Sequence, residues 1–205
     1  MIAIIDYGVG NLFSLKSSFA FITKEAVVTG DPAVIENCDR IILPGVGAFS
    51  DAAKKLKDSG LGDVVKKEAA KGKPILGICL GMQLLFDKSY EYGEHEGLGL
   101  IKGNVKPIAD VVGKDLKIPH IGWNALIFPK NKEKSPLYKY TNEGDFVYFV
   151  HSYYAADCDE SITAVAEYGA MLTASVQNGC VYGAQFHPEK SGTVGLGILK
   201  AFCEI

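Results

Sequence analysis

The chain has 205 residues, enough for one domain with a sizeable core, and we take residues 1–205 as a single domain. Its 48% hydrophobic and 22% charged residues are ordinary for a globular protein in water. The net charge of −3 and a single arginine, Arg40, give no electrostatic reason to expect nucleic acid or a membrane as a partner. No apolar run reaches the length of a transmembrane span.

The cysteine pattern and the first residues bear on compartment and cofactors. The five cysteines are an odd number and include no Cys-x-x-Cys pair, which argues against a disulfide framework and a cysteine-rich zinc site. The histidines show no ligand spacing, and neither a complete dinucleotide fingerprint nor a Walker A loop occurs. An apolar strand pattern starts at residue 1, so we expect no signal peptide. These features predict a cytoplasmic protein without a metal or another cofactor.

Strand and helix patterns alternate in the first half of the chain. Apolar runs predict buried strands at residues 2–6, 40–43 and 74–78, and helical spacing of apolar residues predicts helices at 11–23, 48–57 and 61–71. Such alternation is typical of an α/β fold with a mostly parallel sheet and helices on both faces. Active groups of these folds lie at the carboxyl ends of the strands. The turns at 7–10 and 44–47, and Cys79, all fall at such ends.

The second half is richer in strand patterns. Strands are predicted at residues 145–154, 162–168, 172–177 and 181–186, and Asn178-Gly179 is a signal for a two-residue hairpin turn. A closing helix is predicted at 195–202, and the polar, lysine-rich segment 131–144 is predicted to be a surface loop. We therefore expect antiparallel strands to extend the parallel sheet.

Cys79 is the most informative single residue. It lies in the sequence Gly-Ile-Cys-Leu-Gly at residues 77–81, between an apolar run of strand length and a helix-like stretch. This is the layout of a nucleophile elbow with cysteine in place of serine. At a helix N-terminus the macrodipole would favour the thiolate form of Cys79. The alternative is a buried structural cysteine, which describes most lone cysteines.

Two further segments supply the groups that a cysteine nucleophile needs. His187 and Glu189 are two residues apart, so an extended backbone puts both on one face, where the carboxylate can orient the imidazole. The turn at 44–47 and the amide of Leu80 are candidates for backbone donors to a developing oxyanion. Taken singly, the segment with His187 and Glu189 is also compatible with a polar strand end, and residues 44–47 with an ordinary turn between a strand and a helix.

Together these segments resemble the class I (triad) glutamine amidotransferases over nearly the whole chain. The general motifs are Pro-Gly-Val-Gly at 44–47, Gly-Ile-Cys-Leu-Gly-Met-Gln at 77–83 and Phe-His-Pro-Glu at 186–189. Other segments are similar to one branch of that family, the glutaminase subunits of imidazole glycerol phosphate synthases. These segments are Asp-Tyr-Gly-Val-Gly-Asn-Leu at 6–12, Pro-His-Ile-Gly-Trp-Asn at 119–124 and His-Ser-Tyr at 151–153.

The resemblance implies hydrolysis of L-glutamine to glutamate and ammonia without a cofactor. In that family Cys79 would attack the carboxamide, His187 would move the proton and Glu189 would orient His187. The remaining implied site residues are Val46, Gly47 and Leu80 around the oxyanion, and Gln83, Glu91, His151, Ser152 and Tyr153 in the glutamine pocket.

The resemblance also implies a heterodimer. The partner would be a (β/α)₈-barrel cyclase subunit that uses the ammonia to form imidazole glycerol phosphate and an aminoimidazole carboxamide ribonucleotide in histidine biosynthesis. The interface candidates are Asn11, Trp123, Tyr148 and Lys190. An exposed tryptophan suits an interface anchor, whereas core packing is the alternative for the only tryptophan of the chain.

Val46 motivates a hypothesis about regulation. With Gly-Val-Gly in place of two adjacent glycines, the turn would not hold an amide toward the oxyanion at rest, and ligand at the partner's site would favour the completed hole. Three other functions compete with this interpretation. They are a stand-alone cysteine hydrolase such as a peptidase or deglycase, an amidotransferase subunit for pyridoxal phosphate, anthranilate or folate synthesis, and a non-catalytic module with the same fold.

Overall fold

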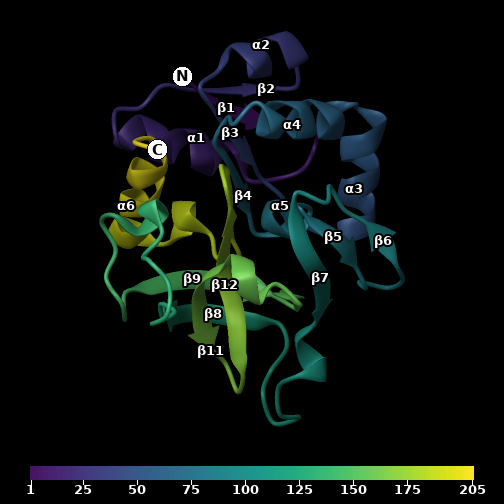
Figure 1. Cartoon of the computed structure of the whole chain (residues 1–205), viewed down its shortest axis with the longest axis vertical. Coiled ribbons are helices and arrows are strands. Elements are labelled where there is room, and N and C mark those ends of the chain that lie inside the picture. Colours follow the sequence, from purple (N-terminus) through teal and green to yellow (C-terminus); the bar gives the residue numbers. More distant parts are fainter.

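The computed structural model describes residues 1–205, and a seven-stranded sheet forms its centre (Figure 1). The strand order is β11-β12-β13-β4-β3-β1-β2, in which β13, β4, β3, β1 and β2 are parallel and β12 and β11 are added antiparallel. This confirms the predicted α/β class with a mostly parallel sheet. The strands are β1 (Ile2–Ile5), β2 (Ala26–Thr29), β3 (Arg40–Leu43), β4 (Ile75–Ile78), β11 (Ile162–Glu167), β12 (Met171–Asn178) and β13 (Val181–Ala184).

Alternate residues of the central strands enter two different cores. Ile5 of β1 and Ile41 of β3 pack with α2, α3 and α4, whereas Ile4 and Ile42, one position along, pack with α1 and α6. Because successive side chains of a strand point to opposite faces, four-residue apolar strands fill both cores at once. The helices are α1 (Leu12–Phe21), α2 (Pro32–Asn37), α3 (Phe49–Asp58), α4 (Leu61–Ala70) and α6 (Gly192–Phe202).

Two smaller sheets complete the fold. One has the order β10-β7-β5-β6 and the other pairs β8 with β9. Their strands are β5 (Phe86–Ser89), β6 (His95–Glu96), β7 (Ile101–Pro107), β8 (His120–Ala125), β9 (Phe146–His151) and β10 (Tyr153–Ala156). The single strand predicted at 145–154 is therefore wrong: Ser152 interrupts it, and its carbonyl accepts from the Ile108 amide so that β9 and β10 join different sheets.

Several other local predictions need correction. The predicted surface loop 131–144 contains a 3₁₀ turn, η2 (Pro136–Tyr138), in which Tyr138 is fully buried and its hydroxyl donates to Ser175. The predicted hairpin is present, but its two turn residues are Gly179 and Cys180 because Asn178 pairs with Val181. Elements β2, α2 and β5 to β8 were not predicted. Three more 3₁₀ turns are η1 (Ile108–Asp110), η3 (Asp159–Ser161) and η4 (Pro188–Lys190).

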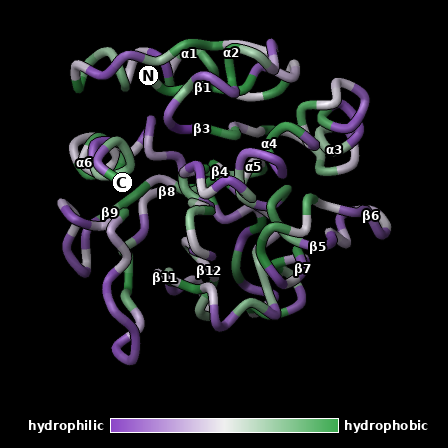
Figure 2. The backbone as a smooth tube through the Cα atoms, turned by 45° about the horizontal axis from the view of Figure 1, so that its top comes forward, coloured by the Kyte–Doolittle hydropathy of each residue, from purple (hydrophilic) through white to green (hydrophobic).

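The topology brings several chain segments to one edge of the central sheet. The residues after β1, β3, β4 and β13 all follow the carboxyl ends of parallel strands, which meet at the same edge. Hydrophilic residues lie in peripheral segments such as the turn at β6, away from the apolar centre (Figure 2). None of the helices has the length and apolarity that crossing a bilayer requires.

Candidate active site

Cys79 occupies a strained turn between β4 and a very short helix, α5 (Leu80–Gln83). Its φ of 55° is unusual for a residue other than glycine, and its side chain is 8% exposed. The flanking glycines make the turn fit, since a Cβ on Gly81 would lie 1.9 Å from the Leu43 carbonyl oxygen and one on Gly77 2.6 Å from that of Gly81. The predicted helix is thus one turn only, because the chain continues directly into β5.

His187 and Glu189 form a buried pair on the segment that follows β13. The Nδ1 of His187 donates to the Oε1 of Glu189 at 2.8 Å, and the two side chains are 3% and 2% exposed. Burial lowers the pKa of His187, but the Cys79 sulfur and the Glu189 carboxylate outweigh it and raise that pKa to about 9. With Nδ1 held by Glu189, the Nε2 of His187 is left for proton transfer.

A cavity of about 290 Å³ joins these groups. Cys79 and His187 line it together with every residue that the sequence nominated for the oxyanion region and the glutamine pocket. Glu189 lies behind His187 and does not line the cavity. The complete lining is Val46, Gly47, Cys79, Leu80, Gln83, Glu91, Pro119, Val150, His151, Ser152, Tyr153 and His187.

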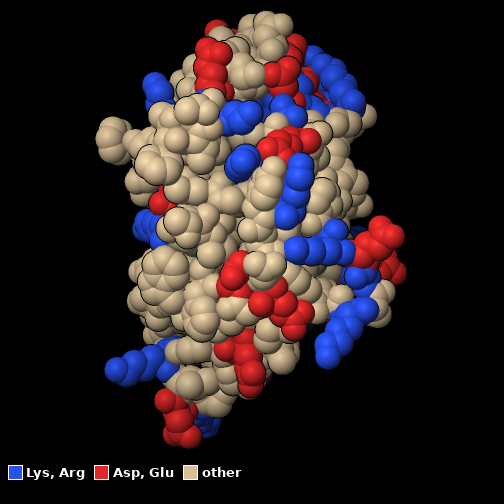
Figure 3. Space-filling view, turned by 90° about the vertical axis from the view of Figure 1, so that its left-hand side faces the viewer, with Lys and Arg blue, Asp and Glu red and all other residues tan.

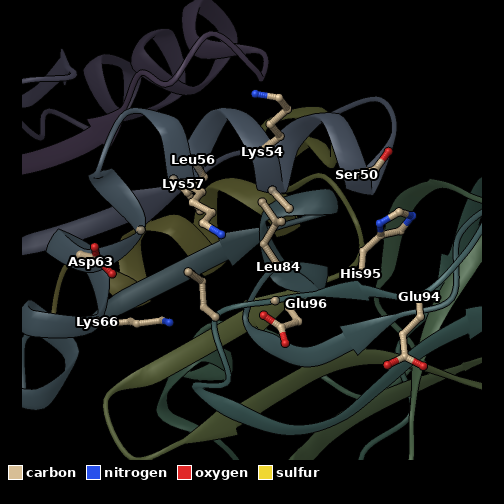
Figure 4. Close-up of a pocket in the computed structure, with 14 residues that line it drawn as sticks. Ser50, Lys54, Leu56, Lys57, Asp63, Lys66, Leu84, Glu94, His95 and Glu96 are labelled. Atoms are coloured by element: carbon tan, nitrogen blue, oxygen red, sulfur yellow. The ribbon is translucent and has the colours of Figure 1, made fainter.

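A larger cavity of about 490 Å³ lies elsewhere, between α3, α4 and β6 (Figure 4). Lys57, Lys66 and Glu96 line this space together with apolar residues such as Leu84. None of the three nominated catalytic residues lines it. The smaller cavity is therefore the candidate active site, since both the nominated nucleophile, Cys79, and its nominated base, His187, line it.

Hydrogen bonds fix the side-chain amide of Gln83 in this cavity. Its Nε2 donates to the Tyr153 carbonyl at 3.2 Å and to the Oε1 of Gln185 at 2.9 Å. Because both partners are acceptors, the two amide protons are used and the Oε1 of Gln83 is free to accept from a ligand. Glu91 accepts from the Phe49 amide at the first turn of α3, which holds its carboxylate at the cavity.

His120 is a residue at the site that the sequence analysis did not nominate. It is buried, and its Nδ1 lies 3.0 Å from the Nε2 of His151, whose Nδ1 donates to the Tyr153 carbonyl at 2.8 Å. His120 is therefore the donor of the pair and His151 the acceptor. Burial lowers the pKa of both rings, that of His151 to about 3, so both remain neutral. No residue pattern in the sequence indicates this contact, which arises from the pairing of β8 with β9.

Two more residues at the site escaped the sequence analysis. The Tyr7 hydroxyl donates to the Pro44 carbonyl at 2.7 Å and so ties the end of β1 to the 44–47 turn. Gln185 is fully buried, with its Nε2 3.8 Å from the Cys79 sulfur. One signal was available for Gln185, because it lies two positions before His187 and an extended chain places both on one face.

The nominated interface residues lie at the start of α1, on the paired strands β8 and β9, and in η4. Trp123 pairs with Tyr148 across β8 and β9, with their rings 6.1 Å apart, and the Nζ of Lys190 lies 5.9 Å from the Tyr148 ring centre. Trp123 is 55% exposed, so it is a surface residue. Asn11 caps α1, which contacts η4, by accepting from the Ser14 amide at 3.4 Å.

Sequence comparison decides the family of the chain. A model of the class-I glutamine amidotransferases matches residues 3–204. The chain belongs to the class-I glutamine amidotransferase family. Among curated relatives, the protein "Imidazole glycerol phosphate synthase subunit HisH" of Oceanobacillus iheyensis is 48% identical, with 100% of this chain and 99% of the relative covered. The protein of the same name from Bacillus licheniformis is 50% identical over 98% of this chain and 95% of the relative.

Solved structures place this amidotransferase within a known fold. A crystal structure described as a glutamine amidotransferase superposes with a TM-score of 0.76 at 20% identity, covering 100% of this chain and 98% of the other. The structure of PurLQS from Thermotoga maritima superposes with a TM-score of 0.72 at 19% identity, covering 99% and 97%. At these identities the likeness concerns the fold alone.

Proposed function

We propose that this amidotransferase is the glutaminase subunit of an imidazole glycerol phosphate synthase, which hydrolyses L-glutamine to glutamate and ammonia. The observation that carries the proposal is one cavity shared by Cys79, His187 and Gln83, with Glu189 bonded to the far side of His187. Relatives at 48% and 50% identity, matched over nearly their whole length and named as HisH subunits of imidazole glycerol phosphate synthase, support this branch of the family. We also propose that residues 1–205 form one domain, in line with the family match over residues 3–204.

The first half of the reaction forms a thioester. The thiol proton of Cys79 passes to the Nε2 of His187, and the sulfur attacks the carboxamide carbon of glutamine. Backbone amides of Leu80 and Gly47 stabilise the resulting oxyanion. His187 then gives the proton to the amide nitrogen, the C–N bond breaks, and ammonia leaves while the acyl group stays on sulfur.

The second half hydrolyses that thioester. A water gives a proton to His187 and attacks the acyl carbon, and the C–S bond breaks to release glutamate. The electron pair of that bond returns to the Cys79 sulfur, which regains a proton from His187. Throughout both halves Glu189 holds the Nδ1 proton of His187 and stabilises the imidazolium form.

The rest of the cavity would select glutamine by its α-amino end. The Oε1 of Gln83 and the carboxylate of Glu91 are acceptors that suit an ammonium group. His151, Ser152 and Tyr153 line the same space, with His151 kept neutral so that it does not repel this cation.

The 44–47 turn would regulate the oxyanion site. Val46 is 43% exposed and Gly47 has a φ of 92°, a conformation that glycine adopts without strain. We infer that the Val46–Gly47 peptide changes orientation when the partner binds its own ligand, and that this completes the pair of donors. Loss of one such donor lowers a rate by on the order of 10²–10³.

The partner would be a (β/α)₈-barrel cyclase subunit that consumes the ammonia in making imidazole glycerol phosphate and aminoimidazole carboxamide ribonucleotide. Its docking face would include Asn11, Trp123, Tyr148 and Lys190. The backbone supports a link from this face to the chemistry, since the His187 amide donates to the Tyr148 carbonyl at 2.9 Å.

The proposal is tested by ammonia release from L-glutamine. We expect little release by the chain alone and strong release when the barrel subunit and its nucleotide ligand are added, abolished by Cys79→Ala. Strong release by the chain alone would remove the regulatory role of Val46 but leave the glutaminase. Absence of release in every mixture would contradict the assigned partner and favour a stand-alone cysteine hydrolase.

A further inference from the structure

Gln185 is the one side chain that links the glutamine pocket to the reacting sulfur from inside the core. It is 0% exposed, on the segment between β13 and His187. Its two amide atoms have different partners: the Oε1 faces the Nε2 of Gln83 at 2.9 Å, and the Nε2 faces the Sγ of Cys79 at 3.8 Å. A polar side chain in such a position needs both partners, because unpaired burial of an amide is costly.

The orientation of the Gln185 amide follows from its neighbours. The Tyr153 carbonyl can only accept, so the group of Gln83 that faces it must be the NH₂. The same NH₂ also faces Gln185, whose partner atom must then be the carbonyl oxygen. The NH₂ of Gln185 is thereby directed at the Cys79 sulfur. The orientation of this amide follows from the hydrogen bonds of Tyr153, Gln83 and Gln185 together rather than from one pair of atoms.

The surroundings of the sulfur make such a donor important. The Val150 carbonyl lies 4.0 Å from Sγ and accepts from the thiol, but it repels a thiolate, which has no proton to give. The sulfur is also buried, since Cys79 is 8% exposed. His187 contacts it on one side, and a second N–H on another side would add to the stabilisation of the thiolate.

We propose that Gln185 is a further functional residue of this site, donating a hydrogen bond from its side-chain amide to the Cys79 thiolate. The donor acts twice: when the thiol proton moves to His187 before attack, and when the C–S bond of the thioester breaks and its electron pair returns to sulfur. This inference rests on Cys79 being the nucleophile, and it adds a contact that no nominated residue supplies.

The test measures the reactivity of the thiol rather than turnover, so it needs neither glutamine nor the partner. Cys79 is alkylated with iodoacetamide over a pH series, and its modification is followed by mass spectrometry, which separates it from the other four cysteines. Gln185→Met keeps similar length without a donor, and Gln185→Glu keeps the shape but brings an acceptor. We expect both to raise the pH midpoint of alkylation by about one unit or more, which lowers the rate roughly tenfold below the midpoint.

Gln177→Met is the matched control. Gln177 is also a glutamine held by hydrogen bonds, with Ser135, Gly179 and Tyr182 as partners, but none of these lines the cavity. Its substitution should leave the alkylation midpoint of Cys79 where it is, while thermal unfolding of each variant shows that the fold is retained. An unchanged midpoint in folded Gln185→Met would overturn the proposal.

A second measurement needs no variant at Gln185. In ¹⁵N-labelled wild-type protein, the side-chain NH₂ resonances of Gln185 should shift with the same midpoint as the alkylation of Cys79, and the shift should vanish in Cys79→Ala. Resonances that do not titrate would also overturn the proposal. A wild-type Cys79 that resists alkylation at every pH would instead contradict the proposed function, so the two failures are distinguishable.

Discussion

At the scale of single residues, the pKa values of two histidines that line one cavity are shifted in opposite directions. Beside the Cys79 sulfur and the Glu189 carboxylate, His187 has a raised pKa, whereas burial next to another imidazole lowers the pKa of His151. Divergent pKa values of neighbouring groups indicate a division of tasks. His187 is suited to carry a proton, and His151 is suited to remain a neutral part of the pocket wall.

The neutral state of His151 predicts a dependence of stability on pH. Its pKa is about 3 in the folded protein and about 6.5 in an unfolded chain, so the unfolded state binds more protons between these values. The free energy of unfolding should therefore fall as pH drops below about 6.5, by up to roughly 1.4 kcal/mol per unit from this group. Denaturant titrations of wild type and His151→Gln from pH 7 to 4 check this.

In those titrations the stability of the wild type relative to His151→Gln should shrink as the pH falls. His95→Gln serves as the control, since His95 is only half-buried, on β6, and the smaller cavity does not include it. Parallel pH curves for wild type and His151→Gln would contradict the assignment of a neutral, buried His151.

At the scale of elements, the turn at Cys79 depends on how closely α5 approaches the end of β3. The backbone of Gly81 lies against that of Leu43, and Gly45 lies against Leu80, so no side chain separates the two elements. This contact brings the 44–47 turn to the side of Cys79. The glycines are thus required for the position of an element as well as for a sharp turn.

Gly81→Ala tests this close approach. The added methyl group would lie 1.9 Å from the Leu43 carbonyl oxygen, and rigid backbone surrounds it, so we expect a loss of about 3 kcal/mol or more in the free energy of unfolding. Gly113→Ala is the control because the new methyl group meets nothing within 4 Å, and it should change stability by less than about 0.5 kcal/mol. Equal effects of the two substitutions in chemical denaturation would refute the argument.

The elements also show what the sequence could and could not predict. Strands β1 and β4 are apolar throughout and β3 is apolar after Arg40, so the sequence pattern alone was enough to predict them. Strand β6 is only His95–Glu96 and β7 carries several polar residues, and both are strands because they pair with β5 rather than because of a strand pattern of their own. Tyr138 was missed because a lysine-rich segment surrounds it, although its own side chain is fully buried.

The same distinction applies to the site. Cys79, His187 and Glu189 stand in short motifs whose local geometry carries chemical meaning, so residue type and spacing nominated them. The partners that hold pocket groups in place are set by topology: the β8–β9 pairing brings His120 to His151, and the packing of α5 on β13 brings Gln83 to Gln185. No local pattern contains that information.

At the scale of the whole molecule, the charged residues do not indicate where a partner binds, whereas the exposed apolar residues do indicate such a surface. On the face that holds α6, acidic and basic side chains are interspersed and do not gather into one field (Figure 3). Trp123, Ile121 and Phe146, each more than half exposed, lie on the paired strands β8 and β9. Exposed apolar groups that gather in one region mark a surface for a protein partner.

Helix α1 offers an internal comparison for locating that surface. Phe13 is 82% exposed in its first turn and Phe21 is 76% exposed in its last. The first turn follows the carboxyl end of β1, so Phe13 lies at the edge of the sheet that carries the candidate active site. Phe21, at the other end of the helix, lies toward the opposite edge.

A binding titration with the proposed barrel subunit would use these residues. Phe13→Ala and Trp123→Ala should each weaken binding about tenfold or more, as expected for aromatic anchors at a partner face. Phe21→Ala removes the same side chain from the same helix but should leave the affinity unchanged. Because all three residues are exposed, none of the substitutions should lower the thermal unfolding temperature appreciably. A larger loss with Phe21→Ala than with Phe13→Ala would place the partner at the other edge, remote from Cys79, and would contradict delivery of ammonia across this face.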